Sequence, residues 1–587
     1  MKIQNISTDV LIIGSGGSAL FSAYLLAKNC SKLNISIASS FNIGAGATMS
    51  AKGGINAALA NVTKDKWQWH AFDTIKSGQG LCNEAVVNKT CRIAPLLIKA
   101  IDKLGVDFDK DENGKIMQRK YGGQRLDYGK GDFAWRACFK SDTTGASIIN
   151  ALKNKVTEHQ NISLHSNLHL VSIDASDKML NNAIFTNIKD DCLVNFNFKY
   201  IIIASGGYSC VYSSATSGGS SSCVPLVLLN TLGADFKDAE FVQFHPTGLY
   251  PSNILISEAC RAEGAYLETE DGERFLKYYS PENMELSSRD VISKAIFTQM
   301  QIDKSDFVYL NLKHIDSNVI KTKLANAYKN AMFFCSKDLT QDRIKIRPVA
   351  HYSMGGLAVD ENYRLNNFTN AFCVGEAACA SLHGANRLGC NSLLELLTSS
   401  LYAVFALKKQ LRSGSDDSVK LSTNKEFNII DLCRQKIKEL TSGDTIKTLD
   451  TKFLINSEIA NTIASEVKYL MDKHLGIVKD RAGMTEILKI INNHLSIFVT
   501  CDLEVKDVMD FNDIINSLCL LKICKTICLA SLKRRESIGS FIRTKREGGE
   551  VSQNNEIQDR QVKQKPTAKQ PRARMLKQNL QRRKNKK

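Results

Sequence analysis

Arg387 lies in the segment HGANRLGCN, residues 383–391, and hydrophobic stretches flank this segment on both sides. An arginine is rarely buried without a partner, because an unpaired charge taken out of water is very costly. The segment itself contains no acidic residue. Arg387 therefore either has a structural acid elsewhere in the chain or binds an anion that is not part of the protein.

A glycine-rich turn near the N-terminus suggests where one such anion binds. The residues GSGGSA match the GxGxxG/A pattern, and they are Gly14, Ser15, Gly16, Gly17, Ser18 and Ala19. The first glycine permits a tight turn, the second allows close approach of a pyrophosphate, and the third small residue lets helix and strand pack closely. The phosphates then bind at the helix N-terminus. The alternative is an ordinary glycine turn in another α/β domain.

The second strand of this unit bears on which dinucleotide is bound. NAD-binding versions of the turn usually place an acid at the end of that strand to hold the ribose hydroxyls. Here the strand ends in Ala38-Ser39-Ser40, without a carboxylate, although the hydroxyl of Ser39 can do the same work. This weakens the case for NAD and leaves FAD open. The later segments IIIASGG (201–207) and CVGEAA (373–378) suit a long FAD molecule.

The elements that must position these residues follow an α/β order. An apolar run at 8–14, a helical pattern at 19–29 and a second apolar run at 33–40 predict the strand–turn–helix–strand unit of a doubly wound sheet. A helix is expected at 146–156, and strands are expected at 163–176 and 199–207. Residues 241–345 mix short strands and helices, and the pattern beyond about 411 is helical.

Composition places the chain among ordinary globular proteins. It has 587 residues, of which 43% are hydrophobic and 23% are charged. The 17 cysteines form no CxxC pair, which argues against a zinc site, an iron–sulfur cluster or a disulfide framework, so we expect no metal site. The chain has no run of about 18 or more apolar residues, so we expect no membrane span. The first residues do not resemble a signal peptide.

The net charge of +17 is concentrated in the C-terminal tail. Residues Arg543–Lys587 contain 15 Lys/Arg and 4 Asp/Glu, a net +11, which leaves +6 for the other 542 residues. After Glu547 the tail has almost no large apolar residues, so it is expected to be disordered. Such a tail could bind RNA or an anionic membrane surface, but it has no aromatic residue for base stacking. The alternative is a solvated tail without a ligand.

Ten motifs in a fixed order resemble the flavoprotein subunits of succinate dehydrogenase and fumarate reductase, and L-aspartate oxidase shares most of them. They are GSGGSAL, KGGINAAL, YGGQRLDYGKG, HPTG, SEACRAEGAYL, DGERF, SSRDVISKAI, HYSMGG, VGEAACASLHGANRLGCNSLLE and KHLGIV. The resemblance covers roughly residues 8–540. It implies an α/β fold with a split Rossmann-like FAD-binding domain (1–240 and 346–410). An α+β capping domain is inserted at 241–345, a helical C-terminal domain spans 411–545, and the tail is 546–587.

The resemblance also implies roles for individual residues. Arg387 would hold a substrate carboxylate, with help from His245, His351 and the hydroxyl of Ser257, and Arg289 would be the proton donor or acceptor. An arginine fork suits a C4 dicarboxylate because it binds a carboxylate bidentately. Besides the glycine turn and Ser39, the residues expected to bind FAD are Thr48, Gly53, Gly54, Glu376, Ser392 and Leu393.

The choice between the two kinds of enzyme depends on one position. Aspartate oxidases typically place a glutamate, which recognises the ammonium group, where this chain has Tyr121. Tyr121 before GGQ and Met354 in HYSMGG favour the succinate/fumarate enzymes. The expected activity is therefore interconversion of succinate and fumarate at FAD, and L-aspartate oxidase of NAD biosynthesis is the alternative.

Four departures from the family pattern raise a further alternative. Ala47 replaces the histidine to which respiratory members attach FAD, so we expect a non-covalent flavin. Val224 replaces an aspartate near the flavin, Ile538 replaces an arginine and Phe541 replaces a histidine. Together these changes leave open a weakened, non-catalytic paralogue that is kept as a structural subunit.

Partners and location follow from the resemblance alone. Such subunits pass electrons to an iron–sulfur subunit, which docks on membrane anchor subunits. The chain is therefore expected to be peripheral on an inner membrane, on its cytoplasmic or matrix side.

Overall fold

The computed structural model describes residues 2–217, 222–413, 429–444 and 454–544. Its main sheet begins with the N-terminal strand, in which Val10–Ile13 are buried on both faces. Such continuous burial is typical of strands in parallel sheets. The strand order is β6-β2-β1-β9-β8-β7, and β16 also pairs with β9. The strands are β1 (Ile3–Ile13), β2 (Ile35–Ala38), β6 (Ile162–His165), β7 (Leu168–Ser176), β8 (Met179–Asn187), β9 (Cys192–Ile203) and β16 (Ala371–Cys373).

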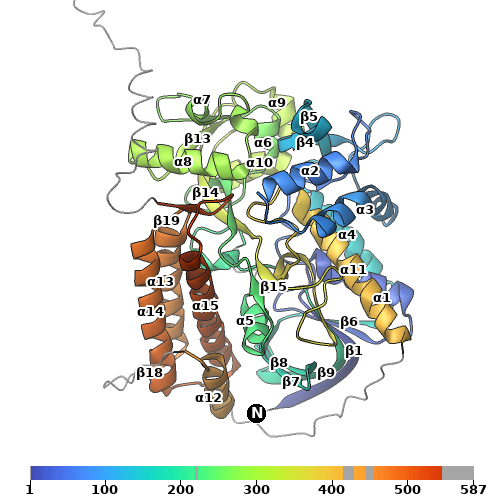
Figure 1. Ribbon diagram of the computed structural model, residues 1–587, viewed down its shortest axis with the longest axis vertical. Coiled ribbons are helices and arrows are strands. Elements are labelled where there is room, and N and C mark those ends of the chain that lie inside the picture. Colours follow the sequence, from blue (N-terminus) through green and yellow to red (C-terminus); the bar gives the residue numbers. More distant parts are fainter. Residues whose placement is uncertain (1, 218–221, 414–428, 445–453, 545–587) are drawn as a thin grey trace, which may run out of the picture.

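The sheet is parallel from β6 to β9, and β8 and β7 extend it in antiparallel order. Helix α1 packs against both α4 and α11, and α3 packs against α2 and α11 (Figure 1). A small sheet with the order β3-β5-β4 lies near the same helices. These elements are α1 (Gly17–Asn29), α2 (Trp67–Ser77), α3 (Glu84–Lys103), α4 (Thr144–Thr157), α11 (Asn391–Arg412), β3 (Ile55–Asn56), β4 (Gln118–Arg125) and β5 (Phe133–Cys138). A further helix, α5 (Val224–Thr231), packs against β7.

The yellow-green elements at the top of Figure 1 have a hydrophobic cluster of their own, and all of its buried residues lie between Leu249 and Ile346. A four-stranded antiparallel sheet with the order β11-β14-β13-β12 supports it. The first and last of these strands in the sequence, β11 and β14, pair with each other. The elements are β11 (Val242–Leu249), β12 (Tyr266–Glu268), β13 (Val308–Asn311), β14 (Ile344–Ser353), α6 (Ala259–Ala262), α7 (Leu276–Tyr279), α8 (Arg289–Asp303), α9 (Ser317–Thr322) and α10 (Ala325–Cys335).

Four helices form the C-terminal bundle, drawn in orange and red in Figure 1. They are α12 (Ile429–Leu440), α13 (Ser457–Leu475), α14 (Arg481–Thr500) and α15 (Val508–Lys533). Helix α15 is long and apolar enough to cross a membrane, but 67% of its most apolar window is buried. It contacts the other three helices, which fits the core helix of the bundle.

The predicted mixed α/β class is confirmed, and so is the strand–turn–helix–strand unit at the N-terminus. The domain boundaries at 240, 345 and 410 remain predictions. The basic tail from 546 to 587 lies outside the described residues, so nothing here bears on its expected disorder or its anionic ligand.

Candidate functional site

A cavity joins the glycine turn to the four-stranded sheet β11-β14-β13-β12, which we call the capping sheet. It brings together nearly all the site residues expected from the sequence: Gly14, Ser15, Gly16, Gly17, Ser18, Ser39, Thr48, Gly53, Gly54, His245, Ser257, Arg289, His351, Glu376, Arg387, Ser392 and Leu393. Ala19 does not line the cavity; it is a fully buried residue of α1.

The glycine turn fits a dinucleotide. Gly14 has φ +110°, and a Cβ there would lie 2.3 Å from the carbonyl oxygen of Ala204, so only glycine fits. The hydroxyls of Ser15 and Ser39 lie 2.7 Å apart, which places polar groups at the end of β2. The N-cap residue of α1 is Gly16, which has no side chain to cap the helix. The N-terminal turn of α1 therefore faces the cavity with its positive dipole.

The N-terminus of α11 forms another part of the cavity wall, through Ser392 and Leu393. The Asn391 side chain fixes this helix end. Its Oδ1 accepts from Nδ2 of Asn56 at 2.8 Å and lies 2.9 Å from Nε2 of His70, while its Nδ2 donates to Thr74 at 3.0 Å. Burial, and then the charge of Arg136, lower the pKa of His70 to about 3.

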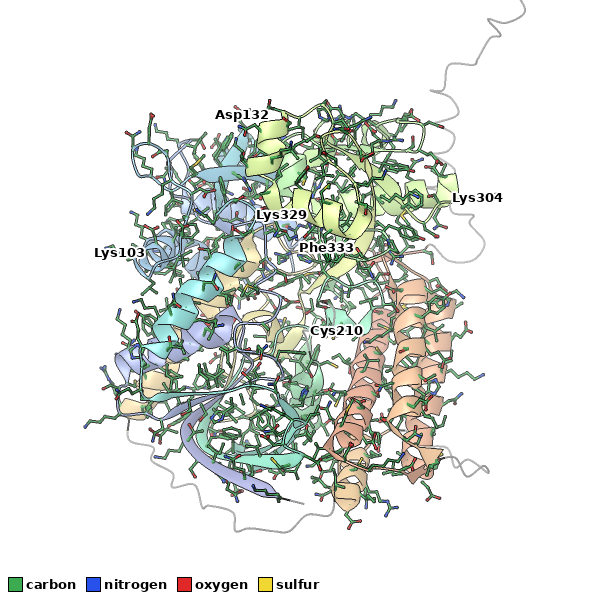
Figure 2. All side chains as sticks on the ribbon, turned by 180° about the vertical axis from the view of Figure 1, so that it is seen from behind. Lys103, Asp132, Cys210, Lys304, Lys329 and Phe333 are labelled. Carbon is green, nitrogen blue, oxygen red and sulfur yellow. The ribbon has the colours of Figure 1, made fainter. Side chains whose placement is uncertain are left out.

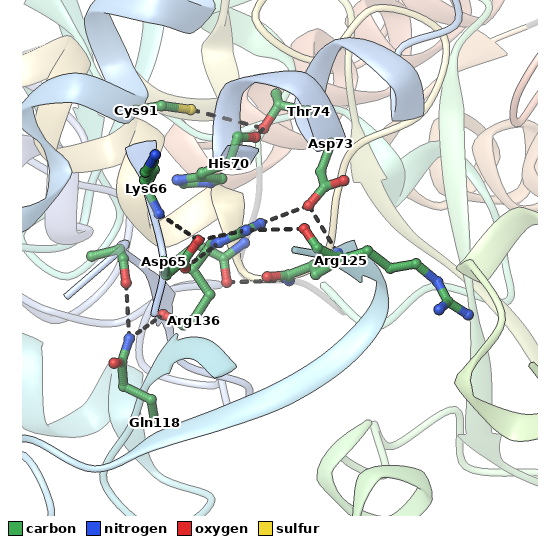
Figure 3. A network of polar contacts seen from close by, with 12 residues as sticks. Asp65, Lys66, His70, Asp73, Thr74, Cys91, Gln118, Arg125 and Arg136 are labelled. Carbon is green, nitrogen blue, oxygen red and sulfur yellow. Dashed lines mark hydrogen bonds and ion pairs between the residues drawn. The ribbon is translucent and has the colours of Figure 1, made fainter. Parts of the chain in front are cut away.

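A buried ion-pair network lies next to His70 (Figure 3). Arg136 is fully buried, and it donates to Asp65 at 2.8 and 3.0 Å and to Asp73 at 2.7 Å. Asp73 also accepts from the backbone N–H of Arg125 at 2.9 Å. The network therefore ties β5, α2 and β4 together next to the His70–Asn391 contact.

Two arginines converge on one amide oxygen at the end of the cavity next to the capping sheet. Nη1 of Arg289 donates to Oε1 of Gln243 at 3.2 Å, and Nη2 of Arg387 donates to the same oxygen at 3.0 Å. Arg289 is also paired with Glu258, since its Nε and Nη2 both lie 2.8 Å from Oε2 of Glu258. Burial would raise the pKa of Glu258, but Arg289 and Arg261 outweigh it and hold this pKa below its usual value.

Arg387 has no acidic partner within ion-pair distance among the described residues. It is 2% exposed, and its Nε is buried with no hydrogen-bond partner in the part of the chain that the structure describes. Its guanidinium lies 4.2 Å from the ring centroid of Tyr352. Burial, and then the charge of Arg289, lower the pKa of Arg387 to about 10. Of the two possibilities raised by the sequence, the structure favours an anion from outside the protein.

Two histidines complete the polar wall. His245 on β11 and His351 on β14 come together because β11 pairs with β14, and their ring centroids lie 5.1 Å apart. Burial, and then the charge of Arg289, hold both pKa values well below 6.5, so both rings are neutral. The backbone N–H of Thr247 donates to Nδ1 of His245 at 3.2 Å. His245 therefore carries its proton on Nε2.

Ser257 and Glu376 also line the cavity. The Ser257 hydroxyl accepts from the backbone N–H of Ala259 at 3.1 Å, which leaves its own proton for a ligand. Oε1 of Glu376 accepts from the backbone N–H of Ser353 at 2.9 Å and from its hydroxyl at 3.2 Å. Burial raises the pKa of Glu376 to about 7.

Sequence reasoning did not single out four residues of this site: Thr216, Gln243, Glu258 and Tyr352. Gln243 and Tyr352 lie two residues and one residue from the chosen histidines, and Glu258 follows Ser257 directly. Their closeness in sequence to predicted site residues is a signal that could have identified them. Thr216 offered none, because it reaches the site only through the fold.

The four departures from the family pattern, and also Tyr121, lie in and around the cavity. Ala47 lines it, so no histidine is available there. Tyr121 is fully buried, and its hydroxyl donates to the carbonyl of Gly53 at 2.8 Å. Ile538 and Phe541 pack in an apolar cluster with Phe241, Tyr352, Met354 and Ala385. Val224 is buried at the start of α5. Part of the segment before Val224 lies outside the described residues.

Comparisons with known proteins agree with this arrangement. Residues 9–393 match the family model described as FAD binding domain. The chain is 30% identical over 558 residues to the mitochondrial succinate dehydrogenase [ubiquinone] flavoprotein subunit of Oryza sativa subsp. japonica, covering 92% of this chain and 85% of that relative. It is 35% identical over 403 residues to the succinate dehydrogenase flavoprotein subunit of Rickettsia felis, covering 66% and 67%.

Among solved structures, the chain resembles the FrdA chain of quinol fumarate reductase from E. coli. The TM-score is 0.79 at 26% sequence identity, over 93% of this chain and 92% of that chain. The glycine turn, the cationic pocket and these likenesses agree with one another. The chain therefore belongs to the FAD binding domain family, among the flavoprotein subunits of succinate dehydrogenase and fumarate reductase.

Proposed function

We propose that the protein is an FAD-dependent oxidoreductase that interconverts succinate and fumarate as the flavoprotein subunit of a respiratory complex. The observation that carries this proposal is the convergence of Arg289 and Arg387 on Gln243 in a cavity that continues to the glycine turn. A dicarboxylate supplies two negative charges to a pocket whose cations are only partly neutralised by Glu258.

FAD would be held by the glycine turn, Ser39, Thr48, Gly53, Gly54, Glu376, Ser392 and Leu393, all of which line the cavity except Ala19 of the turn. When bound, it supplies the two-electron hydride chemistry of the reaction. We propose that its attachment is non-covalent, because Ala47 offers no nucleophile. In this family a covalent link raises the flavin potential, so its absence disfavours succinate oxidation and is more compatible with fumarate reduction or an oxidase.

The substrate-binding residues fix both carboxylates. The free Nε of Arg387 and its Nη groups hold one carboxylate. His245 donates from Nε2, and the Ser257 hydroxyl donates in the same pocket. Because both histidines are neutral, they act as hydrogen-bond donors without adding charge. Polarisation of a carboxylate in this way makes the double bond of fumarate electrophilic.

Arg289 serves as the proton shuttle. In fumarate reduction one carbon would receive the hydride that the reduced cofactor supplies, and the other would receive a proton from the Arg289 guanidinium, which must regain a proton from solvent before the next turnover. Succinate oxidation would run the same steps in reverse. Glu258 fixes this guanidinium through two contacts at 2.8 Å. Arg289 is 8% exposed, which keeps water away from the proton being transferred.

Partners and location are proposed from the relatives. An iron–sulfur subunit and membrane anchor subunits would place the chain at the periphery of an inner membrane, on its cytoplasmic or matrix side. L-Aspartate oxidase is not favoured, because Tyr121 is buried against Gly53 and offers no carboxylate for an ammonium group. A non-catalytic paralogue is not favoured either, because Arg289, Arg387 and both histidines line the cavity.

Steady-state assays with succinate, fumarate and L-aspartate test this proposal. The FAD-loaded protein should turn over the C4 dicarboxylates with an artificial electron donor or acceptor. Oxidation of L-aspartate without turnover of succinate or fumarate would overturn it.

A further inference from the structure

The segment from Cys210 to Thr216 links the C-terminal helices to the substrate histidines. Figure 2 labels Cys210, which begins this segment near the C-terminal bundle. The segment runs from the short helical turn Ser209–Val211, which contacts α15, to the cavity, where Thr216 is one of the lining residues.

Helix α13 holds this segment at two points. Oδ2 of Asp472 accepts from the backbone N–H of Ser214 at 2.7 Å and from its hydroxyl at 3.1 Å. The hydroxyl of Tyr212 donates to the carbonyl of Leu475 at 3.1 Å. Neither contact involves a residue of the substrate pocket itself, so the segment is what connects these two contacts of α13 to the pocket.

The far end of the segment is joined to the strand that carries His351. The backbone N–H of Ala350 donates to Ser214 at 2.7 Å, and the backbone N–H of Thr216 donates to Ala350 at 2.9 Å. These two bonds form a one-residue parallel bridge between Ala215 and Ala350. The Thr216 side chain is thereby placed next to His351, where its Oγ1 lies 2.9 Å from Nδ1.

The Nδ1 contact of His245 shows how a donor at Nδ1 determines which ring nitrogen carries the proton. Thr247 donates to Nδ1 of His245 and so leaves the proton on Nε2. The Thr216 hydroxyl has no hydrogen-bond partner other than His351 among the described residues. When it donates to Nδ1, it fixes the ring orientation of His351 and also places that proton on Nε2. With Nε2–H on both rings, each histidine can donate a hydrogen bond to an anionic ligand.

We infer that Thr216 is a positioning residue, which holds His351 as an Nε2–H donor to the substrate carboxylate, and that Asp472 of the C-terminal bundle keeps Thr216 in place through Ser214. The inference rests on the proposed function only for the identity of the ligand. It makes the C-terminal bundle part of the substrate-binding apparatus.

The test compares four variants of the FAD-loaded protein: Thr216→Val, Thr216→Ser, Asp472→Ala and the control Thr462→Val. Valine keeps the shape of threonine but removes the hydroxyl, and serine restores it. Thr462 lies on the exposed face of α13, and its hydroxyl donates only to Glu458 of its own helix at 2.9 Å. The probe is malonate, a dicarboxylate without a CH2–CH2 bond to oxidise, and binding is followed by the flavin absorbance.

Thr216→Val should weaken malonate binding about tenfold, the effect of one lost hydrogen bond. Thr216→Ser should recover most of that loss. Asp472→Ala should weaken binding by a smaller factor, and Thr462→Val should match the wild type. FAD content should stay the same in all four. Unchanged malonate binding in Thr216→Val, or equal losses in Thr216→Val and Thr216→Ser, would overturn the inference.

Crystal structures of the wild type and Thr216→Val separate this inference from the proposed function. A rotated His351 ring in the variant supports the positioning role, even if the wild type does not turn over succinate or fumarate. An unmoved ring overturns it, whatever the activity of the wild type.

Discussion

Gln243 is the residue that explains how two buried arginines can share one pocket. Its Oε1 accepts from both guanidiniums, while its Nε2 donates to Asn386 and to the carbonyl of Arg387, at 2.8 Å each. The amide is thus oriented by two donors and two acceptors. It holds like charges near each other without neutralising them, which leaves the pocket electropositive for an anion.

Replacement of Arg387 by lysine tests the fork geometry. Arg387→Lys keeps the charge but loses the bidentate contact and the fit over the Tyr352 ring. We expect kcat/KM for fumarate to fall about 10- to 100-fold, as for loss of a charge-assisted hydrogen bond. Arg92→Lys, at an exposed position on α3, is the matched control. Equal kcat/KM in the two variants would contradict the assigned role.

At the scale of elements, the cavity depends on contacts between segments that are distant in sequence. The Arg136 network joins β5 to α2, and His70 joins α2 to the start of α11. His245 and His351 meet only because β11 pairs with β14 in a register that places His245 opposite Val349. The geometry of the site therefore depends on these contacts between elements.

Removal of the central cation of this network should destabilise the protein strongly. Arg136→Met leaves Asp65 and Asp73 buried without their counter-ion, and breaking a buried pair in this way costs about 3–5 kcal/mol. Urea unfolding should show this loss, whereas Arg92→Met should change the free energy of unfolding by less than about 0.5 kcal/mol. A loss below about 1 kcal/mol for Arg136→Met would show that the network adds little to stability.

His70 should make stability depend on pH. Its pKa is about 3 in the folded protein, against 6.5 in the unfolded chain, so the unfolded chain binds more protons between these values. Stability is therefore lost as pH falls below 6.5, by about 1.4 kcal/mol per pH unit from this group. Urea unfolding at pH 7.5 and pH 5 should show a smaller loss in His70→Gln than in the wild type. Equal losses would rule out this source.

At the scale of the whole molecule, the sequence anticipates local features better than junctions. The glycine turn and its flanking strand and helix follow from short-range pattern, and the unpaired Arg387 follows from charge in an apolar segment. The contacts of Gln243, and the path from Asp472 to His351, depend on how the capping sheet and the C-terminal bundle pack. No local pattern encodes such packing. Thr216 is an example, since 135 residues separate it from His351.

The attachment of FAD is a property of the whole holoprotein that can be tested directly. Because Ala47 replaces the linking histidine, acid precipitation should release all the flavin into the supernatant, where its absorbance can be measured. Flavin that stays with the precipitate after washing would contradict non-covalent binding.

The central claim is that this pocket holds a C4 dicarboxylate for reaction at the flavin. The most direct measurement is to reduce the bound flavin anaerobically, add fumarate, and follow the return of the oxidised flavin absorbance, with Arg387→Lys measured in parallel. We predict rapid reoxidation in the wild type and much slower reoxidation in the variant. A flavin that stays reduced with fumarate, or equal rates in both proteins, would contradict the claim.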